Sequence, residues 1–127
     1  MEVCRRREPL MPGKYARGNV WEVNLEPVVG SEKRGRSRPC VIVQNDIGNK
    51  YSPLVIVAVI TDANNVVKCF PVDVYIGKGE GGLTLDSIIQ CNQIRTVDKR
   101  RLVKHLGRLS TGTMARVDTA LKISLQL

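Results

Sequence analysis

The sequence predicts a small, mainly β, barrel-like domain that ends in one α-helix. Short apolar or alternating runs recur along most of the chain, and turns rich in Gly, Pro and Asn separate them. Apolar residues at helical spacing occur only near the C-terminus. The chain has 127 residues, of which 43% are hydrophobic, so it has the length of one domain and enough apolar residues for a packed core.

The first 16 residues show no hydrophobic period. They contain two prolines, a glycine and three consecutive arginines at 5–7, whose charge Glu2 and Glu8 partly offset. We therefore expect a flexible basic N-terminal tail over 1–16 and a single domain over 17–127.

The first strand is predicted at 20–25, where apolar and polar residues alternate and Trp21, Val23 and Leu25 share one face. A loop at 26–37 follows, whose prolines and glycines suit turns and whose lysine and arginines are solvated. The loop is long for a compact domain, which favours a functional role.

Two apolar strands are predicted next, at 40–43 and 55–60, with a turn at 45–49 between them. Arg38 closes the loop before the first strand, and Thr61 ends the second. If the strands are neighbours, a guanidinium and a hydroxyl meet near one surface and can bind a phosphate. The alternative is a buried hairpin with ordinary polar ends.

Further strands are predicted at 69–76, at 85–97 as one or two strands, and at 102–109. A proline within the first of these indicates a sheet edge. The glycine-rich stretch at 77–82 is predicted to be a flexible turn, because it lacks the Lys-Ser/Thr ending of a P-loop. Residues 98–101 form a charged turn.

The C-terminal helix is predicted to begin at an N-cap, Ser110 or Thr111. The apolar residues at helical spacing then form one face that packs on the sheet. These residues are Met114, Val117, Leu121 and Leu125.

Four cysteines and one histidine are too few and too scattered for a usual zinc site, because no CxxC pair is present. We expect neither a metal site nor a cofactor. Cys40, Cys69 and Cys91 lie in apolar strand-like runs, so we expect buried, reduced thiols. His105 is predicted to be a surface or edge residue.

The formal charge of +8 favours a polyanionic partner such as nucleic acid. No signal peptide is recognisable, and the apolar run at 54–60 is too short to span a bilayer. We therefore expect a cytoplasmic protein without membrane contact.

Four stretches carry a resemblance when they are taken in this order and spacing: RGNVW at 17–21, LEPVVGSE at 25–32, RPCVIVQND at 38–46 and QIRTVDKRRL at 93–102. Together they resemble the MazF/PemK family of toxin endoribonucleases. The resemblance implies a compact SH3-like β-barrel with a C-terminal helix, shared with the gyrase poison CcdB. It also implies a homodimer, a cognate antitoxin, and metal-independent cleavage of single-stranded RNA at a short sequence.

The resemblance also implies roles for single residues. The family's catalytic arginine precedes a proline and falls on Arg38, and its catalytic threonine falls on Thr61. Glu32, in the Gly-Ser-Glu of the loop, is the candidate general base, since Arg38 is almost always protonated. The residues expected to bind RNA are Ser31, Lys33, Arg34, Arg36, Gln93 and Arg95.

Two departures from the family pattern are present. Asn19 stands where an acidic residue is usual, and the loop at 31–38 is about one residue longer than in some members. Because of the longer loop, the RNA sequence that this protein prefers does not follow from the resemblance.

Two other functions stay open. One is a gyrase-poisoning toxin of the same fold without RNase activity, and the other is a non-catalytic basic RNA-binding module. The pairing of Arg38 with Thr61 favours the ribonuclease, and the low aromatic content of 4% disfavours base stacking as the main binding mode.

Overall fold

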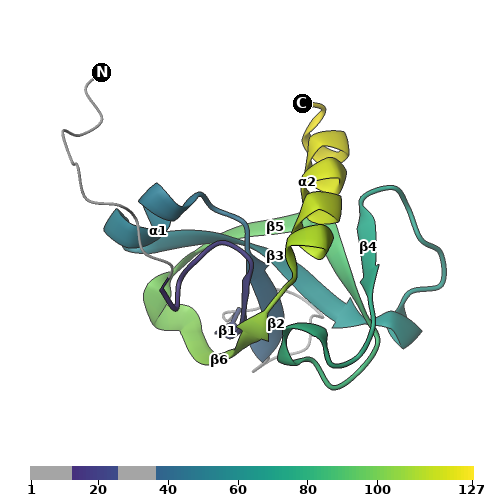
Figure 1. The fold of residues 1–127 in the computed structure, drawn as a ribbon, viewed down its shortest axis with the longest axis horizontal. Coiled ribbons are helices and arrows are strands. Elements are labelled where there is room, and N and C mark those ends of the chain that lie inside the picture. The colour runs from purple at the N-terminus through teal and green to yellow at the C-terminus, as the bar shows by residue number, and fades with distance from the viewer. Residues whose placement is uncertain (1–12, 26–36) are drawn as a thin grey trace.

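Six antiparallel strands form one sheet in the computed structural model, which describes residues 13–25 and 37–127 (Figure 1). Helix α1 (Asp46–Tyr51) connects two strands, and α2 (Thr111–Leu125) is the C-terminal helix. The order along the sheet is β4 (Asp73–Ile76), β5 (Ser87–Asp98), β3 (Leu54–Asp62), β2 (Ser37–Ile42), β1 (Asn19–Asn24) and β6 (Leu102–Arg108). Three short 3₁₀ turns complete the fold: η1 (Ala63–Asn65), η2 (Glu80–Gly82) and η3 (Lys99–Arg101). The prediction of a mainly β domain with a C-terminal helix is confirmed.

The sheet bends strongly. β5 and β6 follow one another through the three residues of η3, yet β3, β2 and β1 lie between them in the sheet order. The end of β5 must therefore curve back to the start of β6. Register shifts between β1 and β6, and between β3 and β5, mark where the strands bend.

The bend encloses the first hydrophobic core, to which β1, β2, β3, β5 and β6 all contribute. Its buried residues include Trp21, Val23, Cys40, Ile42, Val55, Val57, Val97 and Leu102. The second core lies between the sheet and α2 and includes Val20, Val41, Ala58, Ile60, Ile89, Leu109, Val117 and Ala120. β1 serves both cores, because successive side chains of a strand point to opposite faces.

α2 begins where the sequence predicted, since Ser110 is the N-cap and its Oγ accepts a hydrogen bond from the Thr113 amide at 3.1 Å. Val117 is fully buried, and Met114 and Leu121 pack at the margin of the core. The prediction was wrong for Leu125, which is 54% exposed. The last turns of α2 extend past the sheet (Figure 1). No helix of the described residues is long and apolar enough to cross a membrane.

A helix, α1, replaces the turn predicted at 45–49. The Asn45 side chain caps it by accepting a hydrogen bond from the Gly48 amide at 2.8 Å. The side-chain Nδ2 of the buried Asn49 donates to Gln44 O at 2.9 Å and to Asp46 Oδ1 at 3.0 Å. These bonds satisfy the polar groups of the connection within a helical turn, which turn-residue statistics alone did not indicate.

The strand predicted at 69–76 is shorter than expected, because only Asp73–Ile76 pairs with β5. Pro71 has no amide hydrogen for a ladder, and the Phe70 amide donates to Asp73 Oδ2 at 2.9 Å, which closes a turn. β4 does lie at the sheet edge, as predicted. Cys69 is exposed, so the prediction of a buried thiol was wrong there, whereas Cys40 and Cys91 are buried and free.

Residues 13–16, which the sequence assigned to the tail, pack against β1. The Asn19 side-chain amide donates to Gly13 O at 2.9 Å and to Lys14 O at 2.8 Å. Trp21 Nε1 also donates to Lys14 O, at 2.7 Å. A carboxylate at position 19 could not donate these bonds. The Asn19 that departs from the family pattern therefore holds this segment in place.

The glycine-rich connection after β4 is fixed by close packing. Its turn η2 lies against β6, and a Cβ added to Gly107 would come within 2.5 Å of the Gly81 carbonyl carbon. A Cβ at Gly82, whose φ is +76°, would overlap the carbonyl oxygen of Leu106. Glycines let the two backbones approach one another, so the interpretation of 77–82 as a flexible turn was wrong.

Glu80 links this connection to α2, and acid is expected to weaken the link. Hydrogen bonds from Thr113, and then from the Ser110 amide and hydroxyl, hold the pKa of Glu80 below its ordinary value of 4.5. A lowered pKa in the folded protein adds stability that is present above pH 4.5 and is lost as the pH falls through the folded pKa. Glu80→Gln should therefore reduce the acid-induced drop in the thermal unfolding midpoint. An identical drop in both proteins would contradict this role.

Candidate active site

Arg38 and Thr61 face each other across two neighbouring strands. The β2–β3 register pairs Cys40 with Val59, and the same register continued by two residues sets Arg38 opposite Thr61. Opposite residues of an antiparallel pair share a face. Both residues line one cavity of about 350 Å³. The structure thus brings together the guanidinium and the hydroxyl that the sequence singled out.

Polar groups from three segments surround the pair. Asp62 and Asn65 come from the end of β3 and from η1, Thr84 comes from the connection before β5, and Ser87 begins β5. Asn65 Nδ2 donates to Thr61 Oγ1 at 3.5 Å. A hydroxyl oxygen that accepts this bond keeps its own hydrogen to donate to a ligand. The cavity can therefore offer a cation and an oriented O–H group to one anion.

These additional polar residues were missed by sequence reasoning. The only signal was the Asn64-Asn65 pair, which the sequence showed as part of a polar connection. Asn65 reaches the site because Asp62 Oδ1 accepts a hydrogen bond from the Asn64 amide at 2.9 Å, which starts η1 directly after β3. Thr84 and Ser87 reach it through pairing between β3 and β5, which local patterns do not encode.

A buried thiol lies beneath the site. Burial raises the pKa of Cys40 to about 12, although the guanidinium groups of Arg95 and Arg38 act to lower it. The thiol therefore stays protonated near neutral pH and is not a nucleophile. The strand registers set Arg95 opposite Val57 and Arg38 opposite Thr61, and these two β3 residues share a face, so both arginines lie on the same side of the sheet.

The other predicted site residues lie apart from the cavity or outside the description. Arg95 is exposed on β5 opposite Val57, about 13 Å along β3 from Thr61. Gln93 is exposed where β5 bulges, because Ala58 pairs with Ile94 while Val59 pairs with Gln90. Six loop residues lie outside the described residues: Gly30, Ser31, Glu32, Lys33, Arg34 and Arg36.

His105 lies on the edge strand β6 and is exposed, as predicted. Its ring tilts against Trp21, with 5.3 Å between the ring centroids, and it does not line the cavity. Within 13–25 and 37–127, no three His, Cys, Asp or Glu side chains gather in a way that could hold a metal ion.

Comparison with known proteins decides the family. A family model described as the PemK-like, MazF-like toxin of type II toxin–antitoxin systems matches residues 16–125. The chain belongs to this family. The resemblance seen in the four sequence stretches is thereby confirmed.

Individual relatives agree with this family. Endoribonuclease MazF of Staphylococcus epidermidis is 54% identical over 111 residues, which are 87% of this chain and 91% of that protein. An endoribonuclease in complex with its cognate antitoxin, from a mycobacterial species, has a TM-score of 0.71 at 26% identity and covers 88% of this chain and 95% of its own. MazF from Deinococcus radiodurans has a TM-score of 0.71 at 20% identity, with coverages of 88% and 96%, and shows the likeness of fold.

Proposed function

We propose that this member of the family is a toxin endoribonuclease that cleaves single-stranded RNA at a short sequence without a metal ion. The observation that carries the proposal is the cavity shared by Arg38 and Thr61, in a chain 54% identical to an endoribonuclease. The 2′-hydroxyl of the RNA attacks the adjacent phosphate and leaves 2′,3′-cyclic phosphate and 5′-hydroxyl ends.

Arg38 and Thr61 act on the phosphate in this mechanism. The guanidinium donates two parallel hydrogen bonds to the non-bridging oxygens and neutralises the charge that develops on the phosphorane. The Thr61 hydroxyl donates to the same group, and Asn65 orients that hydroxyl. Glu32 is the candidate general base, and a positioned acid or base contributes roughly 10²–10⁴-fold.

RNA binding away from the scissile phosphate uses the remaining predicted residues. Arg95 supplies a cation on the same side of the sheet as Arg38, and Gln93 lies two residues before it. Ser31, Lys33, Arg34 and Arg36 of the loop complete the RNA-binding set. Arginines that contact phosphates make binding fall steeply with salt.

The finer description of the fold and the assembly belong to the same proposal. β5 and β6 lie on opposite sides of β3, β2 and β1 in the sheet order, yet only η3 joins them. This short connection across the curved sheet supports an SH3-like barrel. We propose a homodimer that acts in the cytoplasm. A related toxin has been solved with its cognate antitoxin, which supports such a partner here. The basic loop at 33–38 is proposed to attract an acidic antitoxin segment that blocks RNA.

The two alternatives are less well supported. A gyrase poison of the same fold has no need of a guanidinium and a hydroxyl in one cavity. A non-catalytic RNA-binding module likewise gives no reason for Asn65 to orient Thr61.

The experiment that tests the function is cleavage of a long RNA by the purified protein in EDTA. We expect cuts at a short recurrent sequence, with 5′-hydroxyl ends that a kinase labels without prior phosphatase treatment. The 3′ ends should carry a cyclic phosphate that acid opens. Cleavage that requires Mg²⁺ and yields 5′-phosphate ends would overturn the mechanism.

A further inference from the structure

A second cavity, of about 370 Å³, lies at the other end of the sheet from Arg38 and Thr61. We call it the lysine pocket; Lys14, Tyr15, Asp46, Asn49, Lys50 and Lys99 line it. η3 and α1 meet here at the start of β3, where the Lys99 amide donates to Pro53 O at 2.9 Å. Leu54 and Thr61 lie near opposite ends of β3, at most about 23 Å apart along the strand, and the two cavities share no lining residue.

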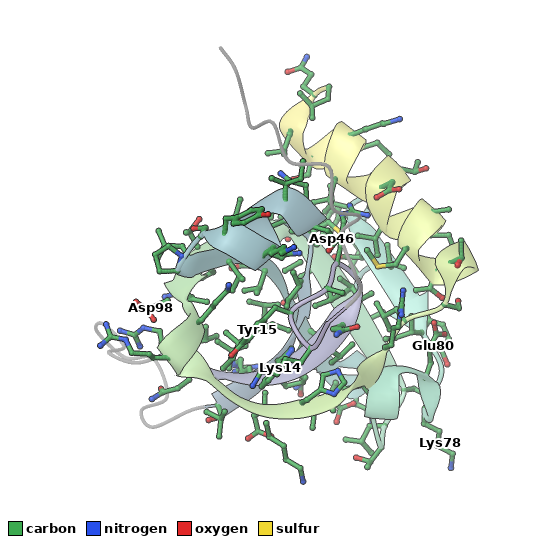
Figure 2. The ribbon with its side chains drawn as sticks, turned by 60° about the vertical axis from the view of Figure 1, so that its left-hand side comes forward. Lys14, Tyr15, Asp46, Lys78, Glu80 and Asp98 are labelled. Carbon is green, nitrogen blue, oxygen red and sulfur yellow. The ribbon has the colours of Figure 1, made fainter. Side chains whose placement is uncertain are left out.

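Ammonium groups dominate the lysine pocket. Lys99 Nζ lies 4.9 Å and Lys14 Nζ 5.2 Å from the centroid of the Tyr15 ring. Lys99 Nζ also donates to Asn49 O at 2.6 Å, which fixes its position. Lys50 adds a third cation at the end of α1. Figure 2 shows Lys14, Tyr15 and Asp46 on one side of the molecule, away from Lys78 and Glu80.

Asp46, the one carboxylate among the described residues that line the lysine pocket, is already engaged. Asp46 Oδ1 accepts hydrogen bonds from the Arg17 amide at 2.7 Å and from Asn49 Nδ2 at 3.0 Å. Among the described lining residues, Lys14 and Lys99 alone outnumber the hydrogen-bonded carboxylate, so the concave site has a net positive charge. Such a site attracts an anionic group.

The form of the pocket favours a peptide over RNA. Trp21 stacks on Tyr15 with 5.3 Å between centroids and 13° between planes, and the two ammonium groups lie over the same ring. The Tyr15 ring inside the pocket is therefore covered and is not offered to a base, although base stacking is the main source of sequence-tolerant RNA binding.

Exposed apolar side chains lie beside the cations. Ile47 and Tyr51 of α1 are 47% and 48% exposed, and Leu54 at the start of β3 is 42% exposed. Ile47 and Tyr51 are four residues apart and therefore share one face of α1. Apolar side chains next to a charged pocket are typical of a protein-binding surface.

We propose that the lysine pocket and the neighbouring Ile47 and Tyr51 bind an acidic segment of a partner protein. Glutamate or aspartate carboxylates enter the pocket, and apolar residues of the same segment cover Ile47 and Tyr51. The site is remote from the Arg38–Thr61 cavity, so its occupation leaves that cavity open.

The test uses the full chain and a fluorescent synthetic peptide of Glu-Glu-Leu repeats, with a Gln-Gln-Leu peptide as its uncharged match. The pocket variant is Lys14→Gln/Lys99→Gln, in which the new amide at 99 can still donate to Asn49 O. The control variant is Lys68→Gln/Lys122→Gln, two exposed lysines elsewhere that give the same change in net charge. Binding is measured by anisotropy at low and physiological salt, and carbodiimide coupling followed by mass spectrometry locates the carboxylates.

We expect the acidic peptide to couple to the pocket lysines, and its affinity to fall about tenfold or more in the pocket variant. The control variant should change affinity by less than about threefold, and RNA cleavage by both variants should stay near the wild-type rate. The proposal is overturned if wild type does not bind the peptide, or if the pocket variant binds it as wild type does. A rise in KM for RNA with unchanged peptide affinity would instead make the pocket an RNA subsite. A chain that bound the peptide but never cut RNA would refute the proposed function and retain this site.

Discussion

Arg38→Ala is expected to slow RNA cleavage by about 10²–10³-fold or more, with little change in the free energy of unfolding. Arg38 lines the cavity and is half-buried there. Its guanidinium can pair with two phosphate oxygens at once. Its loss leaves the developing charge of the phosphorane without a preorganised cation. Single-turnover cleavage of a short RNA that contains the preferred sequence measures the effect on the chemical step.

Two further variants separate charge from geometry at this site. Arg38→Lys keeps the charge but not the planar fork, so we expect it to restore little activity. Thr61→Val removes the hydroxyl and nearly keeps the side-chain shape, whereas Thr61→Ser keeps the hydroxyl. The valine variant should lose activity to a similar order as Arg38→Ala, and the serine variant should retain most of it. Wild-type cleavage by a folded Arg38→Ala protein would show that the site assignment is wrong.

Gly82→Ala is expected to destabilise the fold by about 4 kcal/mol. A left-handed backbone costs a non-glycine residue about 1–3 kcal/mol, and overpacking adds about 1–3 kcal/mol. The new methyl group would overlap the carbonyl oxygen of Leu106, a backbone atom that cannot move without displacing β6. A domain is stable by only about 5–15 kcal/mol, so this one methyl group removes a large share of the total.

Gly79→Ala is the matched control, because Gly79 also has a positive φ, of +98°, but a Cβ there meets nothing within 4 Å. It should cost only the conformational part, about 1–3 kcal/mol, and not the additional cost of overpacking. Equilibrium unfolding in urea compares the two variants with wild type. Equal losses from the two substitutions would show that the contact between η2 and β6 is not what requires glycine at position 82.

Local patterns predicted most of the strands. β1, β3 and β6 have the residues and nearly the bounds that alternation and apolar runs indicated, and Ser110 caps α2 as its side chain suggests. Local patterns were less successful where side chains form hydrogen bonds with the backbone of a connection. The Asn45 cap and the buried Asn49 make a helix of a predicted turn. The bond from Phe70 to Asp73 shortens β4 and leaves Cys69 exposed.

The sequence by itself determined the family, the main strands and the two residues that meet in the candidate active site. Arg38 and Thr61 were found because each lies at the end of a local segment, and antiparallel pairing of two consecutive strands makes those ends neighbours. The tertiary structure alone decided the order of the strands, the contact of η2 with β6, and the lysine pocket built from residues 13–16, α1 and η3. The physical reason is that a period in the sequence shows which face of an element is buried but not what covers it. That choice is made by packing between segments distant along the chain, such as Lys14 and Lys99 on the ring of Tyr15.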